Sequence, residues 1–200
     1  MSNFFKRLER GFIRGAIYLY CKIVYRLEVV GTENIPKTGG IIFCGNHRSF
    51  LDPPLIQVTC KRDDTRFLAK EELTKNPFLA YLSKVFNVIL VKRNDKDTGP
   101  MKQSLKTLKS NQCIALFPEG TRNGLKKGEK VKGGASFFAL NSNAAIIPVG
   151  IKGGEKPFKK ATITYGKPLN LEEYKQTRKE KETVEKVTNL IMDNILELTK

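Results

Sequence analysis

The only histidine of the chain, His47, lies in the segment NHRSFLD at residues 46–52, and Asp52 follows it five positions later. An imidazole titrates near neutrality and can accept a proton from a substrate. A carboxylate on its other ring nitrogen fixes the tautomer and stabilises the imidazolium that forms. The pair is therefore a candidate general base with its orienting acid, and the alternative is an ordinary surface turn.

The proline after Asp52 decides how this pair can form. On one continuous helix, residues five apart diverge by roughly 140°. Pro53 disfavours helical backbone at Asp52 and suits the first position of a helix. We therefore expect Asp52 to be the N-cap of a helix, and residues 47–51 to form a turn that folds His47 back toward Asp52.

A second polar turn follows the apolar run at residues 113–117. Pro118 and Gly120 favour a tight bend that presents Glu119, Thr121 and Arg122. A guanidinium suits a phosphate, and free amides around the glycine could bind a developing oxyanion. The alternative is a surface turn without function, in which the arginine pairs with the glutamate.

The elements before these turns are predicted to bring them together. The segments at residues 39–45 and 113–117 are short apolar runs typical of buried strands. Open α/β sheets bind their ligands at the carboxyl ends of the strands. One shared site therefore explains two strands that both end in polar turns.

Four segments together resemble the 1-acyl-sn-glycerol-3-phosphate acyltransferase family, the lysophosphatidic acid acyltransferases. NHRSFLD at residues 46–52 and FPEGTR at 117–122 resemble its first and third sequence blocks. NVILVKR at 87–93 resembles the second block, with Asn87 in place of the usual glycine, and asparagine tolerates left-handed backbone better than most residues. IIPVGI at 146–151 resembles the fourth block, and the four follow the family's order.

The resemblance implies transfer of an acyl group from a thioester donor, acyl carrier protein or coenzyme A, to the 2-hydroxyl of lysophosphatidic acid. A thioester is already activated, so a histidine that deprotonates the hydroxyl suffices and no acyl-enzyme is needed. No metal or other cofactor is expected. Another lysophospholipid or glycerol 3-phosphate is the alternative acceptor, because the histidine chemistry is the same.

The resemblance also assigns expected roles to individual residues. The catalytic group is His47, Asp52, Glu119 and Gly120, the last two organising the turn. The residues expected to bind the substrate phosphate are Arg93, Arg122 and Lys70, although Lys70 is equally well explained as an ordinary cation at the start of a helix. The supporting positions of the blocks are Asn46, Ser49, Pro118, Thr121 and Pro148, and Ser49 is expected to stabilise its turn rather than to act as a nucleophile.

Composition indicates one domain in a reducing compartment. Two hundred residues with 40% hydrophobic content suffice for one α/β core, and the chain has no repeat or linker. Its four cysteines have no metal-binding spacing, and two lie in apolar runs. Disulfides and zinc are therefore not expected.

The net charge of +16 suggests a polyanionic partner, either an anionic membrane or a nucleic acid. In residues 3–27 an apolar stripe at helical spacing is flanked by Lys and Arg, which favours a helix lying in the plane of a bilayer interface. Its longest uncharged stretch is too short to cross a membrane. The alternative is a helix packed on its own domain. No nucleic-acid-binding motif is present, so only charge supports that class.

Along the rest of the chain apolar strands alternate with amphipathic helices. This alternation predicts an α/β fold with a mixed, mostly parallel sheet covered by helices. We expect an interfacial helical segment at residues 1–30 and the acyltransferase domain at 31–200. The expected location is the cytoplasmic face of the cell membrane, as a peripheral or monotopic protein.

Overall fold

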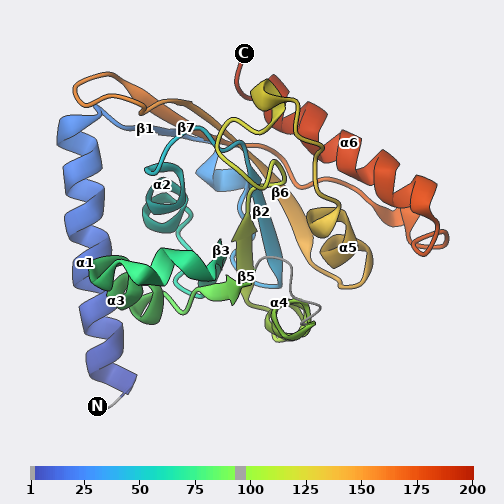
Figure 1. The fold of residues 1–200 in the computed structure, drawn as a ribbon, viewed down its shortest axis with the longest axis horizontal. Coiled ribbons are helices and arrows are strands. Elements are labelled where there is room, and N and C mark those ends of the chain that lie inside the picture. Colours follow the sequence, from blue (N-terminus) through green and yellow to red (C-terminus); the bar gives the residue numbers. More distant parts are fainter. Residues whose placement is uncertain (1–2, 93–97) are drawn as a thin grey trace.

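The computed structural model describes residues 3–92 and 98–200, which form a single α/β domain around one sheet (Figure 1). The seven described strands run in the order β1-β7-β6-β2-β5-β3-β4. All neighbouring pairs are parallel except β6 and β7, which are antiparallel. The predicted mixed, mostly parallel sheet is therefore confirmed. The strands are β1 Glu28–Val30, β2 Ile41–Gly45, β3 Thr65–Lys70, β4 Ile89–Val91, β5 Cys113–Leu116, β6 Ala145–Gly153 and β7 Ala161–Tyr165.

Helices cover both faces of the sheet. α1 (Asn3–Val24), α2 (Asp52–Thr59) and α3 (Pro77–Val85) lie on one side, and α4 (Gly99–Lys109), α5 (Gly134–Leu140) and α6 (Lys181–Glu197) on the other (Figure 1). Single turns of 3₁₀ helix lie at Thr32–Asn34, Glu71–Lys75, Leu125–Lys127 and Glu172–Tyr174.

Alternate residues of the central strand β2 supply the two halves of the core. Ile41 and Phe43 pack into the layer beneath α1 and α2. Ile42 and Cys44 pack into the layer beneath α5 and α6. The uninterrupted apolar run of β2 is thus explained by burial on both faces, as parallel strands require.

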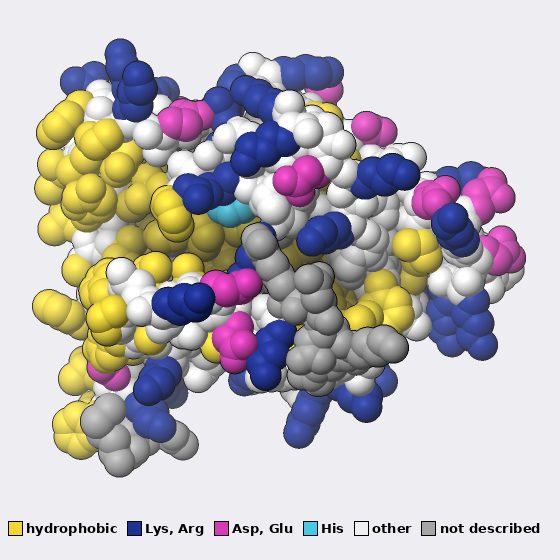
Figure 2. All heavy atoms as spheres, in the orientation of Figure 1, with side chains coloured by type: hydrophobic (Ala, Val, Ile, Leu, Met, Phe, Trp, Pro, Cys, Tyr) yellow, Lys and Arg dark blue, Asp and Glu magenta, His cyan; other side chains and the backbone are white. Residues whose placement is uncertain are grey.

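The N-terminal helix α1 has one face packed on the domain and one face exposed. One edge packs on the domain, since Cys21 and the following Tyr25 are buried in the core and α1 contacts α2 and α3. The opposite stripe of large apolar side chains is exposed to solvent. It comprises Phe4, Phe5, Leu8, Phe12, Leu19 and Ile23, and it forms much of the hydrophobic edge at the left of Figure 2.

Two cations of α1 are bound by the domain itself. Arg10 Nε donates to the Val85 carbonyl oxygen at 2.9 Å, and Arg14 forms an ion pair with Asp63. Arg10 and Arg14 therefore attach the helix to the domain, rather than simply flanking the apolar stripe. Lys6 and Arg7 remain exposed. None of the helices in the described ranges has a stretch long and apolar enough to cross a membrane.

The four cysteines are buried free thiols. Burial raises the pKa of Cys21 to about 11 and raises that of Cys44 further. Cys44 lies three residues before His47 but is inaccessible within β2, so it packs as a small apolar side chain.

Candidate active site

His47 and Asp52 meet just beyond the carboxyl end of β2. The Nδ1 atom of His47 lies 2.9 Å from Oδ2 of Asp52. The imidazole is stacked on the ring of Phe117, with centroids 4.3 Å apart and planes 19° from parallel. The predicted turn that folds His47 back toward Asp52 is confirmed. Nε2 has no hydrogen-bond partner among the described residues, and the side chain keeps 18% of its surface exposed, so this nitrogen is available to a substrate.

The expectation that Asp52 is the N-cap of a helix was wrong. Asp52 is the first residue of α2, and Leu51 holds the cap position with helical backbone. Pro53 and Pro54 have no N–H to be capped, and the N–H of Leu55 already donates to the Leu51 carbonyl oxygen. The carboxylate therefore has no helix amide to bind and faces the preceding turn instead.

The buried Asp52 carboxylate holds that preceding turn together. Its Oδ2 accepts hydrogen bonds from the backbone amides of Arg48 at 2.6 Å and Ser49 at 2.7 Å. The Ser49 hydroxyl donates to Oδ1 at 3.0 Å and accepts from the Leu51 amide. The geometry of Ser49 is thus that of a turn-stabilising hydroxyl.

Asn46 attaches the end of β2 to β6. Its buried amide side chain donates to the carbonyl oxygen of Ile151 at 2.9 Å and accepts from the amide of the same residue at 2.7 Å. These two bonds continue the ladder between the strands past the point where β2 ends. The position from which His47 projects is therefore fixed by β6.

Glu119 joins the two polar turns. Its buried carboxylate accepts from the His47 backbone amide at 3.0 Å and from the Leu125 amide at 3.1 Å. The His47 carbonyl oxygen in turn accepts from the Asn123 amide at 2.6 Å. The alternative of a surface ion pair between Glu119 and Arg122 is thus excluded, because Glu119 is buried and its oxygens bind backbone amides.

Gly120 allows the tight bend but does not supply a free amide. Its φ of +69° is a conformation that favours glycine, and a side chain there would collide with Lys132. Its N–H donates to the Phe117 carbonyl oxygen at 2.9 Å, closing the turn. This amide is therefore not one of the free amides around the glycine that could bind an oxyanion. The carbonyl oxygen of Pro118 accepts from the Lys132 amide, which fixes the other side of the bend.

Arg122 lies over the ring of Phe50, with its guanidinium carbon 3.8 Å from the ring centroid. This cation–π contact joins the tip of the second turn to the tip of the first. Thr121 contributes a buried hydroxyl oxygen that has no hydrogen-bond partner among the described residues. The site thus presents an imidazole and an exposed guanidinium on adjoining turns, with an unpaired hydroxyl buried beside them.

Three further predicted positions, Lys70, Asn87 and Pro148, belong to other segments than this pair of turns. Lys70 is the last residue of β3 and the N-cap of the 3₁₀ turn Glu71–Lys75, so it does lie at the start of a helical segment. Asn87 has the left-handed backbone, φ +50°, that its place in the second block suggested. Arg93 lies outside the described residues. Pro148 is buried in β6 opposite Cys44, and its carbonyl oxygen accepts from the Gly166 amide.

Three contributors to the site were not singled out from sequence. The ring of Phe117 stacks on the imidazole, and the ring of Phe50 contacts the Arg122 guanidinium. The amide of Asn123 donates to the carbonyl oxygen of His47. Only their position in the sequence could have indicated these residues, because each lies within or next to a polar turn. Only the pairing of the two turns reveals what each side chain contacts.

A family model described as Acyltransferase matches residues 26–152, a range that contains both turns and most of the sheet. The chain belongs to the acyltransferase family. The match ends inside β6 and therefore includes Ile151, the hydrogen-bond partner of Asn46.

Relatives with assigned names agree with this membership. This acyltransferase is 33% identical to a 1-acyl-sn-glycerol-3-phosphate acyltransferase of Borreliella burgdorferi over 126 residues, which are 62% of this chain and 50% of the relative. It is 25% identical over 195 residues to the enzyme of that name from Bacillus subtilis, covering 91% of this chain and 96% of the relative.

A solved structure has the same fold. The crystal structure of the 1-acyl-sn-glycerophosphate (LPA) acyltransferase PlsC from Thermotoga maritima superposes with a TM-score of 0.64 at 26% identity. The superposition covers 92% of this chain and 80% of that one. The shared fold therefore extends over most of this acyltransferase.

Proposed function

We propose that this acyltransferase moves a fatty acyl group from a thioester donor to the 2-hydroxyl of 1-acyl-glycerol 3-phosphate, giving phosphatidic acid. The observation that carries the proposal is the His47–Asp52 pair at 2.9 Å, beside a turn that presents Arg122. The names of the Borreliella, Bacillus and Thermotoga relatives support the choice of acceptor. Family membership also favours an enzyme over a nucleic-acid-binding protein.

In the proposed reaction His47 acts as a general base in direct transfer. Nε2 takes the proton of the acceptor hydroxyl while the oxygen attacks the thioester carbonyl carbon. The resulting tetrahedral intermediate collapses, the carbon–sulfur bond breaks, and the imidazolium returns the proton to the leaving thiolate. Asp52 keeps Nδ1 protonated and stabilises the imidazolium between the two steps.

The acceptor phosphate is proposed to lie along the carboxyl edge of the sheet. Arg122 follows β5 and Lys70 ends β3, the neighbouring strand. The resemblance adds Arg93, which follows β4 in sequence. The strand order β2-β5-β3-β4 therefore supports a phosphate site on one side of His47.

The enzyme is proposed to work on the cytoplasmic face of the membrane, bound at its surface. The exposed apolar stripe of α1 would enter the headgroup boundary, with Lys6 and Arg7 among anionic lipids. The acyl donor is acyl carrier protein or coenzyme A. The domain division at residue 30 remains part of this proposal.

The test is an acceptor and donor panel with purified enzyme. Acceptors are 1-acyl-glycerol 3-phosphate, glycerol 3-phosphate and a lysophosphatidylcholine, each offered with acyl carrier protein and coenzyme A thioesters. Formation of phosphatidic acid from the first acceptor, with the highest kcat/KM, is the expected result. A higher kcat/KM with either other acceptor would overturn the proposed acceptor, and no transfer to any of them would overturn the function.

A further inference from the structure

The loop between β6 and β7, residues 154–160 with the sequence GEKPFKK, combines three lysines with a phenylalanine. None of these four residues has a role in the proposed catalysis. Phe158 at its tip is 75% exposed and has a left-handed backbone with φ 62°. Bulky residues rarely adopt this conformation. The loop thus holds a large apolar side chain in solvent on a backbone that does not favour it.

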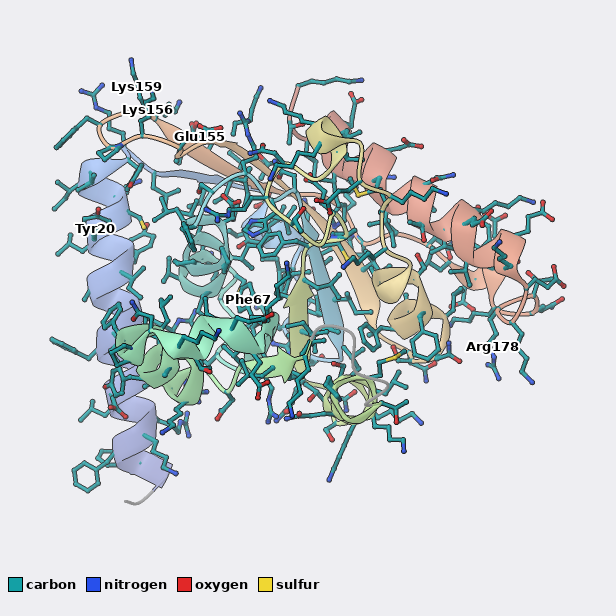
Figure 3. All side chains as sticks on the ribbon, in the orientation of Figure 1. Tyr20, Phe67, Glu155, Lys156, Lys159 and Arg178 are labelled. Atoms are coloured by element: carbon teal, nitrogen blue, oxygen red, sulfur yellow. The ribbon has the colours of Figure 1, made fainter. Side chains whose placement is uncertain are left out.

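Cations surround this phenylalanine. Lys156 and Lys159 are exposed, and neither forms an ion pair with any residue in the described ranges. Figure 3 shows both side chains pointing away from the body of the molecule at the end of α1. Lys160 is different, because it pairs with Glu28 at 2.8 Å. Two unpaired cations therefore flank the exposed ring.

The loop is attached to the end of α1. The Phe158 amide donates to the Val24 carbonyl oxygen at 2.8 Å, and the Ala161 amide donates to that of Tyr25 at 2.8 Å. The last turns of α1 carry the exposed side chains of Tyr20 and Ile23. The apolar stripe of the helix and the apolar tip of the loop are thus neighbouring parts of one surface.

The same loop is also joined to the catalytic turn. Glu155 forms an ion pair with Arg48, the residue next to His47. The side chain of Leu51 lies close to Gly154. The loop and the turn that contains His47 are therefore in direct contact.

We propose that the β6–β7 loop is a second membrane contact, in which Phe158 enters the headgroup boundary of an anionic bilayer and Lys156 and Lys159 bind lipid phosphates. This inference rests on the proposed membrane-surface function and extends it beyond α1. An acidic carrier protein would use the lysines alone. The exposed ring and its continuity with the stripe of α1 favour the bilayer.

Such a contact gives the enzyme a defined orientation. The apolar stripe of α1 alone restrains rotation about the helix axis only within the width of the stripe. A second contact beside the end of that helix narrows this range, and the Glu155–Arg48 pair places the His47 turn next to that contact. The loop would thus direct the site toward an acceptor held in the same bilayer.

The chain has no tryptophan, so one substitution creates a clean probe of depth. In Phe158→Trp the single indole should be quenched by lipids brominated on their acyl chains when the full-length protein binds phosphatidylglycerol-containing vesicles. Leu196→Trp is the control, since α6 covers the other face of the sheet. Quenching at position 196 but not at 158, or at neither while the protein is bound, overturns the proposal.

Charge reversal tests the lysines. Lys156→Glu with Lys159→Glu should weaken cosedimentation with phosphatidylglycerol-containing vesicles by at least roughly tenfold. Arg178→Glu with Lys179→Glu changes the charge equally at the opposite end of the molecule, where Figure 3 places Arg178, and should bind as the parent does. Phe158→Ser should weaken binding and Phe158→Leu should retain most of it.

The outcomes separate this inference from the function on which it rests. If the parent protein binds no vesicle, the proposed membrane-surface function fails. If the parent binds and the two charge-reversed pairs have equal effects, only the loop proposal fails. Loss of acyl carrier protein binding with unchanged vesicle binding would assign the lysines to the donor and overturn the membrane assignment. Thermal melts of all variants check that each is folded.

Discussion

At the level of single residues, the Asp52 carboxylate does more than orient an imidazole. It accepts four hydrogen bonds, from His47 Nδ1, two backbone amides and the Ser49 hydroxyl, while fully buried. Charge-assisted hydrogen bonds of this kind are roughly twice as strong as neutral ones. The turn and the candidate base therefore depend on the same group.

Replacing His47 tests the general base. His47→Ala should lower kcat by roughly a hundredfold to ten-thousandfold, because the acceptor hydroxyl is then deprotonated by water alone. Vesicle binding and the thermal melting temperature should stay near those of the parent. Near-normal turnover by the folded variant would contradict the mechanism.

Asp52→Asn should reduce both activity and stability. The amide group places an N–H₂ where the carboxylate now accepts from donors, so at least one backbone amide loses its partner. We expect a loss of about 1–3 kcal/mol in the free energy of unfolding, in addition to slower turnover. Denaturant titration and initial rates measure the two effects. Unchanged stability would show that the turn does not depend on this charge.

Arg122→Lys tests the phosphate site. A lysine cannot reproduce the bidentate fork or the planar stacking on Phe50. The KM for 1-acyl-glycerol 3-phosphate should rise while that for the thioester donor changes much less. Equal effects on both substrates would indicate a structural role. The same measurement on Arg93→Lys tests the role that the resemblance gives to Arg93.

At the level of elements, the amino ends of three strands are held by one side chain. Arg62, buried in the loop between α2 and β3, donates to the carbonyl oxygens of Pro36, Gly39 and Asn111. It also pairs with Asp64 at 2.8 Å, and the hydrogen bond to this carboxylate raises the pKa of the guanidinium. The loops before β2, β3 and β5 thus share one cation, at the opposite edge of the sheet from His47.

Arg62→Ala should therefore destabilise the fold without a direct effect on the chemistry. Three carbonyl oxygens and a carboxylate lose their donor, which predicts a cost of about 2–4 kcal/mol. The midpoint of urea unfolding measures it, and Lys61→Ala is an exposed neighbouring control. A kcat that falls in the folded variant would show that this edge of the sheet also affects the site.

At the level of the whole molecule, the two faces of α1 determine how its role can be tested. Deleting residues 1–27 would remove Cys21, Tyr25 and Leu27 from the core, so loss of binding could follow from unfolding. Point substitutions on the exposed stripe avoid that difficulty. The ion pair of Arg14 with Asp63 likewise makes Arg14 unsuitable for a membrane test.

The triple variant Phe5→Ser, Phe12→Ser and Ile23→Ser should lose vesicle binding and keep its melting temperature, because all three side chains are exposed. Each buried aromatic or aliphatic side chain contributes about 1.5–3 kcal/mol, so binding should weaken by at least roughly a hundredfold. Charge reversal at Lys6 and Arg7 should weaken binding less, and the difference should shrink as salt rises. Full vesicle binding by the triple variant would show that α1 is not the anchor.

The sequence by itself determined the local parts of this protein. The strands that precede His47 and Pro118, the N-terminal helix and the closing α6 follow from apolar runs and periodicity, which act between near neighbours. The contact between His47 and Asp52 could also be predicted from the sequence, because Pro53 and the five-residue separation restrict the conformations of the turn. The resemblance to a family, which short motifs carry, also indicated the chemistry.

Only the tertiary structure decided the contacts between segments far apart in the chain. Glu119 binds the His47 backbone across 72 residues, and Asn46 reaches Ile151 across 105. No local sequence pattern predicts these hydrogen-bond partners. A carboxylate or an amide side chain forms hydrogen bonds with whichever backbone groups the folded sheet places next to it. The attachment of Arg10 and Arg14 to the domain, and the place of the β6–β7 loop beside α1, were set in the same way. The physical reason is that strand order and helix docking depend on packing of the whole core, which no single segment contains.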